Sequence, residues 1–111
     1  MNVYDTANRL AQEIKTSEEY MNFKMAKQAI NLNTELKNKI EKFQQLRYEE
    51  QIMAIQTGKD DEEKMKKMQE MYAELLENSE AKKYFEAEAK FNILFADINK
   101  IIGDSIKELM E

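Results

Sequence analysis

The sequence predicts an all-α protein of four to five antiparallel helices, with a central helical hairpin and a long C-terminal helix. The chain of 111 residues has no proline and only two glycines, so few residues interrupt a helix. Apolar side chains recur three and four residues apart along most of its length, which is the spacing of one helix face. The length suits one small domain, so we expect residues 1–111 to form a single all-helical domain.

Two helices are predicted at the start of the chain. The first runs from Val3 to Ile14, with Asn2 as a candidate N-cap. Ser17 is the candidate N-cap of the second helix. The two glutamates that follow it also indicate a helix start, because negative charges are favourable at the positive end of the helix dipole. This helix fades at residues 31–33. Its expected apolar face consists of Tyr20, Met21, Phe23, Met25, Ala26 and Ile30.

The apolar spacing in the middle of the chain predicts the helical hairpin, in which a helix over 34–57 packs against one over 62–77. Asn33 or Thr34 can cap the first helix. Gly58 is expected just beyond its end, where a left-handed backbone favours glycine. The second helix carries an apolar stripe of Met65, Met68, Tyr72 and Leu75, flanked by Met71 and Leu76. The expected stripe of the first helix is Leu36, Ile40, Phe43, Leu46, Tyr48, Ile52, Met53 and Ile55.

The last predicted helix, from Ser79 to Leu109, is the most strongly patterned part of the chain, and Ser79 is its candidate N-cap. Gly103 is expected to mark a fraying point rather than the end. The apolar face is wide, and a lone helix of this kind is unstable in water, so other helices must cover it. This candidate core or oligomer face consists of Tyr84, Phe91, Leu94, Phe95, Ile98, Ile101 and Ile102.

The composition argues against an enzyme. The chain has no cysteine and no histidine, which removes thiol nucleophiles, imidazole acid–base chemistry and the usual ligands of zinc and haem. Its serines have neither a histidine partner nor a nucleophile motif. The acidic run 60–63 fits a helix start better than a metal cage, with Asp60 or Asp61 as the cap. We therefore expect no catalytic residue, no metal and no cofactor.

Charge and hydropathy also limit the classes of partner that we expect. The formal net charge is -5, and lysines alternate with glutamates along the hairpin, as on a solvated face. An acidic protein of this kind is not expected to bind nucleic acid directly. No apolar run is long enough to span a membrane, and the first fifteen residues lack the pattern of a secretory signal. We expect a cytoplasmic protein that does not insert into membranes.

The eight methionines are the most suggestive feature for function, because methionine adapts easily to partner surfaces. Several of them lie on the hairpin, on both sides of Gly58. They either fill ordinary core positions or form a contact surface for another protein, with Met53 and Met71 the better partner-facing pair. The candidate partner-binding residues are Met53, Met65, Met68 and Met71.

Several short segments stand in an order and spacing that match a known family. They are VYDTANRLAQEI at 3–14, Ser-Glu-Glu-Tyr at 17–20, Gln-x-Gly at 56–58, the acidic loop 60–63, Tyr-Phe-Glu-Ala-Glu at 84–88 and FNILFADINKII at 91–102. Taken together, they resemble the YlbF/YmcA family of small helical bacterial proteins, and in layout its YheA-like members. No single segment is diagnostic, and the resemblance spans nearly the whole chain.

The resemblance implies an all-α fold and a non-enzymatic role. Some family members are regulatory partners in complexes that influence competence, sporulation and biofilm formation and aid RNA processing by ribonuclease Y. It therefore implies family paralogues and ribonuclease machinery as partners. Iron–sulfur clusters are associated with that complex through cysteines, which this chain lacks.

Two functional hypotheses follow. The leading one is a cytoplasmic regulatory adaptor that binds other proteins through helix faces and forms a homo-oligomer. The alternative is a structural, self-assembling helical bundle with no external partner. The wide apolar face of the last helix in so small a chain supports oligomerisation under both.

Overall fold

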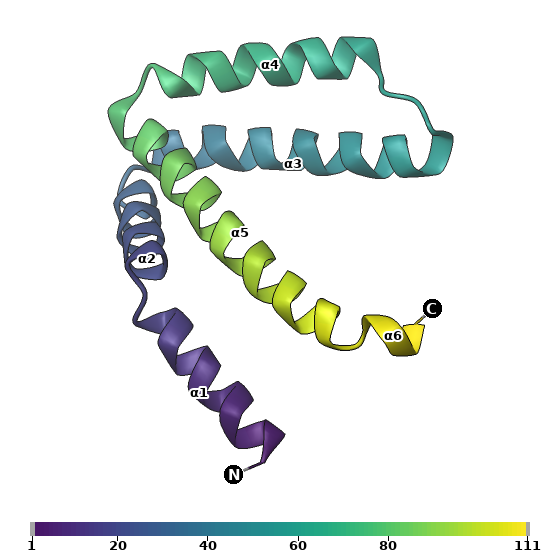
Figure 1. Cartoon of the computed structure of the whole chain (residues 1–111). Helices are drawn as coiled ribbons and strands as arrows, with labels where there is room; N and C mark the ends of the chain where they lie inside the picture. Colours follow the sequence, from purple (N-terminus) through teal and green to yellow (C-terminus); the bar gives the residue numbers. More distant parts are fainter. Residues whose placement is uncertain (1, 111) are drawn as a thin grey trace. The chain divides into compact units, whose positions relative to one another are not determined.

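A computed structural model describes residues 2–110, which form six α-helices and no strand (Figure 1). The all-α prediction is therefore confirmed, including the hairpin and the long C-terminal helix. The helices are α1 (Val3–Lys15), α2 (Glu18–Asn31), α3 (Thr34–Thr57), α4 (Glu62–Leu76), α5 (Ser79–Ser105) and α6 (Lys107–Met110).

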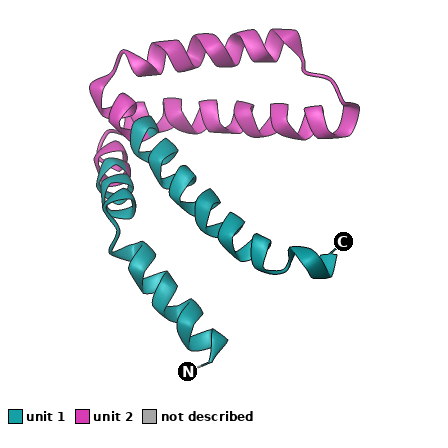
Figure 2. Ribbon diagram, viewed as in Figure 1, with its two compact units in different colours: residues 1–26, 85–111 teal, residues 27–84 magenta. Residues whose placement is uncertain are grey.

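The chain divides into two compact units (Figure 2). Unit 1 comprises residues 1–26 and 85–111, and unit 2 comprises residues 27–84. Helices α2 and α5 each begin in one unit and end in the other. The expectation that residues 1–111 form a single domain is not tested by this division into two units and stays a prediction.

Unit 2 contains the antiparallel hairpin of α3 and α4, which lie side by side (Figure 1). The ring of Phe43 on α3 stacks on that of Tyr72 on α4 with 5.4 Å between centroids, and the Arg47 guanidinium lies 5.5 Å from the Phe43 ring centre. The Gln44 amide donates a 2.9 Å hydrogen bond to the Tyr84 hydroxyl. The buried apolar residues of this unit are Ile30, Leu36, Ile40, Phe43, Leu75, Ala81 and Tyr84.

Unit 1 is built around aromatic contacts between α2 and α5. The Phe91 ring lies 6.1 Å from the Tyr20 ring and 5.8 Å from the Phe23 ring. It also stacks on Phe95 along α5 at 6.1 Å. Phe85 and Ala87 are buried, whereas no residue described in α1 or between 88 and 110 is buried. The apolar side chains of α1 and of residues 88–110 are therefore all half-buried or exposed.

Local capping signals set the helix ends largely as predicted. Asn2 Oδ1 accepts from the backbone N–H of Asp5, and Ser17 Oγ from that of Tyr20. Asn33, rather than Thr34, caps α3 by accepting from Leu36 N–H. The cap of α5 is Asn78, which accepts from Glu80 and Ala81 N–H, so the prediction of Ser79 was wrong. Both residue types cap well, and Ser79 becomes the first helical residue instead.

The end of the chain also departs from the prediction of one helix to Leu109. Helix α5 passes through Gly103, as expected, but stops at Ser105. The Ser105 hydroxyl donates a 2.6 Å hydrogen bond to the Ile102 carbonyl, and Ile106 lies outside the helix. The short α6 that follows brings the number of helices in residues 2–110 above the predicted four to five.

Candidate interaction surfaces

The turn between α3 and α4 is fixed by a set of local hydrogen bonds. Gly58 has φ of 72° and its N–H donates to the Ala54 carbonyl, which ends α3 as predicted. The Thr57 hydroxyl bonds the Met53 carbonyl at 2.8 Å. Asp61 then begins α4 by accepting from the N–H groups of Glu63 and Lys64. The acidic run 60–63 thus starts a helix, and the tip of the hairpin has a defined conformation.

Glu50 is a buried anchor of this turn that the sequence analysis missed. Its side chain is 4% exposed, and its Oε1 accepts from the backbone N–H of Asp61 at 3.1 Å. Its Oε2 is buried without a hydrogen-bond partner. The alternating charges of the hairpin predicted a solvated face, and this prediction was wrong at Glu50. One stripe of α3 continues at the same helical spacing past its apolar members, and it consists of Leu36, Ile40, Phe43, Arg47 and Glu50. This spacing was the sequence feature from which the burial of Glu50 could have been predicted.

The outer side of α3 exposes apolar side chains that were expected in its stripe. Tyr48 is 64% exposed and Ile55 is 84% exposed, so the predicted broadening of the stripe was wrong at these positions. Seven residues span about two helical turns, so Tyr48 and Ile55 share one side of α3, and Tyr48 lies about half a turn away from Glu50. The inner side is occupied by the contacts with α4. The hairpin therefore presents large apolar groups to its surroundings.

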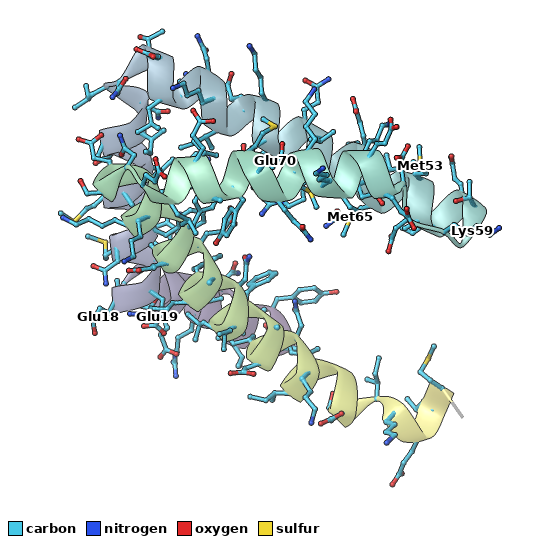
Figure 3. All side chains as sticks on the ribbon, turned by 90° about the horizontal axis from the view of Figure 1, so that it is seen from above. Glu18, Glu19, Met53, Lys59, Met65 and Glu70 are labelled. Carbon is cyan, nitrogen blue, oxygen red and sulfur yellow. The ribbon has the colours of Figure 1, made fainter. Side chains whose placement is uncertain are left out.

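The four candidate methionines of the hairpin are all half-buried. Met53 lies near the end of α3 and Met65 near the start of α4, so both flank the tip that carries Lys59 (Figure 3). Met68 and Met71 follow farther along α4. Burial does not separate Met53 and Met71 from the other two. A half-exposed methionine contributes to the hairpin and still offers apolar surface to a partner, so this assignment stays a prediction.

Ion pairs between α3 and α4 lie on the surface. Lys64 Nζ is 4.0 Å from a carboxylate oxygen of Glu49, and Lys39 Nζ is 4.0 Å from one of Glu74. Such exposed pairs contribute little to stability, at most about 1 kcal/mol each. The stacked rings and the Glu50 hydrogen bond are therefore the stronger ties within the hairpin.

The candidate core or oligomer face of α5 changes character along the helix. Tyr84 is buried, while Phe91, Leu94 and Ile98 are half-buried. Phe95, Ile101 and Ile102 are exposed, Ile101 to 71%. In the second helix of the chain, Met21 and Met25 are also exposed, although we expected them in its apolar face. The face thus fills the interior at its start and is open at its end.

Two further observations concern residues 2–110. No three carboxylates in this range lie close enough together to hold a metal ion. No helix there has both the length and the apolar character needed to cross a membrane.

Comparisons with known proteins place the chain among small bacterial proteins. It is 32% identical over 110 residues to a UPF0342 protein of Desulfitobacterium hafniense (strain Y51), which covers 99% of this chain and 89% of the relative. It is 34% identical over 102 residues to a UPF0342 protein of Halothermothrix orenii, which covers 92% and 86% of the two chains.

A solved structure shows the same fold. The crystal structure of Bacillus subtilis RicA in complex with RicF contains a chain that matches with a TM-score of 0.61 at 21% identity. The match covers 98% of this chain and 96% of the other. The family model described as "Control of competence regulator ComK, YlbF/YmcA" matches residues 3–107. The chain therefore belongs to the YlbF/YmcA family, as its motif order indicated.

Proposed function

We propose that this protein is a cytoplasmic, non-enzymatic adaptor that binds other regulatory proteins through the open apolar surface of its hairpin. The exposure of Ile55 and Tyr48 on α3, in a hairpin that also carries four half-buried methionines, is the observation that carries the proposal. Large apolar side chains gathered on one element are typical of protein interaction sites. The absence of cysteine and histidine from the sequence leaves few options for catalysis.

The family supports the choice of partner class. Its description names control of a competence regulator, and the RicA structure holds that protein together with a second protein, RicF. For this chain we propose partners of the same kind, namely family paralogues and, through them, ribonuclease machinery. Methionine side chains suit such a role because they adapt to surfaces of different shape.

The test is capture of partners by the tagged full-length protein from a lysate of its own host, treated with ribonuclease and analysed by mass spectrometry. Wild-type protein should recover family paralogues. The double variant Met65→Gln/Met68→Gln, which keeps the side-chain length but adds polar groups, should recover at least tenfold less. The control Gln69→Ala changes an exposed neighbour on α4 and should recover the wild-type amount.

Folding of each variant is checked by circular dichroism and thermal unfolding. Equal recovery by the wild type and the folded double variant contradicts a methionine contact surface. Recovery of the tagged protein alone, together with a defined oligomer in solution, contradicts the adaptor and favours the self-assembling structural bundle.

A further inference from the structure

Helix α1 carries an apolar stripe that stays largely open. Val3, Ala7, Leu10 and Ile14 follow one another three and four residues apart, so they share one side of the helix. No residue of α1 is buried, and Val3 is 81% exposed. An amphipathic helix of only 13 residues is marginal in water unless another surface covers its apolar side. The stripe of α1 therefore needs a covering surface.

A second open stripe lies in the same compact unit, on the C-terminal half of α5 (Figure 2). Phe95 and Ile102 are 47% and 51% exposed, and Ile98 between them is half-buried. The two stripes have the same spacing when their helices run in opposite directions. Four residues separate Ile14 from Leu10 on α1, and four residues separate Ile98 from Ile102 on α5.

The aromatic cluster of unit 1 sets the direction and the register in which the two stripes can meet. The Phe91 ring lies 6.1 Å from the Tyr20 ring and 5.8 Å from the Phe23 ring. The end of α1 must therefore lie nearer to Phe91 than its beginning does, and along the rest of α5 only an antiparallel course of α1 meets this requirement. Ile14 precedes the two α2 rings by six and nine residues, and Ile98 follows Phe91 by seven, so Ile14 comes opposite Ile98.

We infer that α1 is a movable cover for the α5 stripe and that the structure describes its open form. In the closed form, α1 lies antiparallel on the C-terminal half of α5, with Ile14 on Ile98 and Leu10 on Ile102. A partner that binds this stripe then has to displace α1, so the cover limits access to this face. The inference concerns unit 1 and does not depend on the proposed adaptor function of the hairpin.

The closed seam contains no charged side chain. The next pair along it is Ala7 with Ser105, two small residues that let the helices approach closely. The Ser105 hydroxyl already donates to the Ile102 carbonyl, so it does not lose a partner when it is covered. The charged residues of α1 lie outside its stripe, and they are Asp5, Arg9, Glu13 and Lys15. Closing the cover therefore removes apolar surface from water without desolvating a charge in the seam.

Two residues, Thr16 and Ser17, separate α1 from α2 and form the pivot of the cover. Thr16 has φ of -97° and ψ of -1°, at the margin of the helical region, from which helical and extended conformations are both accessible. The side-chain hydrogen bonds of Ser17 are local, because its hydroxyl donates to the Ile14 carbonyl and accepts from the Tyr20 N–H. Rotation at these two residues changes the direction of α1 and leaves the rings around Phe91 in place.

The short connection favours α1 over a separate molecule as the cover. A segment that is tied so closely to its site has an effective concentration on the order of millimolar. A separate helix of equal affinity must reach a similar concentration to compete with it. In dilute solution, the stripe of α5 is therefore covered by α1 of the same chain.

The natural absence of cysteine makes closure measurable by disulfide formation. The double variant Leu10→Cys/Ile102→Cys of the full-length protein is oxidised in dilute solution and separated on a non-reducing gel. It should form a disulfide within one chain at least tenfold faster than Leu10→Cys/Ile93→Cys does, at a rate that does not change on dilution. Ile93 is 61% exposed and lies on the opposite side of α5 from the stripe, so it is a matched control.

Two results of this experiment overturn the inference. Equal rates for the two double variants show that α1 has no preference for the stripe. Disulfide dimers that form faster as the protein concentration rises show that α1 of the same chain is not what covers the stripe.

The reactivity of a single thiol on the stripe is an independent measurement. Ile102→Cys should react with a thiol reagent at least fivefold faster when it is combined with Leu10→Asp, because a charge on the α1 stripe opposes closure. Combination with Gln12→Asp should leave the rate unchanged, since position 12 lies on the opposite side of α1. Circular dichroism checks that both variants keep their helices. Equal labelling rates in the folded variants overturn the cover.

Discussion

The backbone N–H of Asp61, the first capping residue of α4, donates a 3.1 Å hydrogen bond to the buried carboxylate of Glu50 on α3. One side chain thus ties the start of the second hairpin helix to the body of the first. Asp61 Oδ1 in turn accepts hydrogen bonds from the backbone N–H groups of Glu63 and Lys64 in the first turn of α4. Glu50 and Asp61 together hold the tip of the hairpin in one conformation.

Glu50→Ala should lower the free energy of unfolding by about 1–3 kcal/mol, because it removes the buried acceptor of the Asp61 N–H. Glu50→Gln keeps a carbonyl oxygen at this position and should lose less. The measurement is urea denaturation followed by circular dichroism. Glu49→Ala, which removes only surface contacts, namely the ion pair with Lys64 and a 3.3 Å hydrogen bond from Gln45, is the control and should cost less than about 1 kcal/mol. Equal losses for Glu49→Ala and Glu50→Ala argue against the anchor role.

Gly58→Ala should destabilise the protein by about 1 kcal/mol, because residue 58 has φ of 72° and side chains with a Cβ are strained there. Space is not the reason, since a Cβ at this position meets nothing within 4 Å. Thermal unfolding should show a lower midpoint. Gly58→Asn, whose side chain tolerates the left-handed region better, should recover part of the loss.

Gly103→Ala should have the opposite effect. Residue 103 lies inside α5, and an added Cβ meets nothing within 4 Å. Alanine favours a helix over glycine by up to about 1 kcal/mol. Thermal unfolding of the variant should therefore show a higher midpoint and more helical signal at elevated temperature. An unchanged or lower midpoint shows that glycine has another role at this position.

Asn78→Ala should destabilise the protein by about 1 kcal/mol, because Asn78 caps α5 by accepting from Glu80 and Ala81 N–H. Ser79→Ala is the matched neighbour and should be close to neutral, since Ser79 is the first residue of the helix. Urea denaturation compares the two. A larger loss of unfolding free energy from Ser79→Ala than from Asn78→Ala would contradict Asn78 as the cap and assign the N-cap to Ser79, as the sequence predicted.

The parts of the fold that depend on local signals were predictable from the sequence. Asn2, Ser17 and Gly58 act at helix ends as their residue types indicate. The choice between Asn78 and Ser79 was not predictable, because both types accept backbone N–H groups and they are adjacent in sequence. Only the course of the backbone before α5 decides between them.

The burial pattern of α3 was less predictable than its ends. Hydropathy favoured Tyr48 and Ile55 for the interior, yet both are exposed, while the charged Glu50 is buried. The position of α4 decides which side of α3 is covered, and hydropathy does not contain that information. The same limit holds for the candidate methionines, which share one residue type and one intermediate burial.

The hairpin also has a consequence for the order of folding. Helices α3 and α4 are joined by residues 58–61 alone, so their contacts connect parts of the chain that are close in sequence. Closing so short a loop costs little entropy and takes well under a microsecond. Contacts of low sequence separation generally form early and speed folding. We therefore expect α3 and α4 to pair first, before Phe91 on the late helix α5 finds Tyr20 and Phe23 near the beginning of the chain.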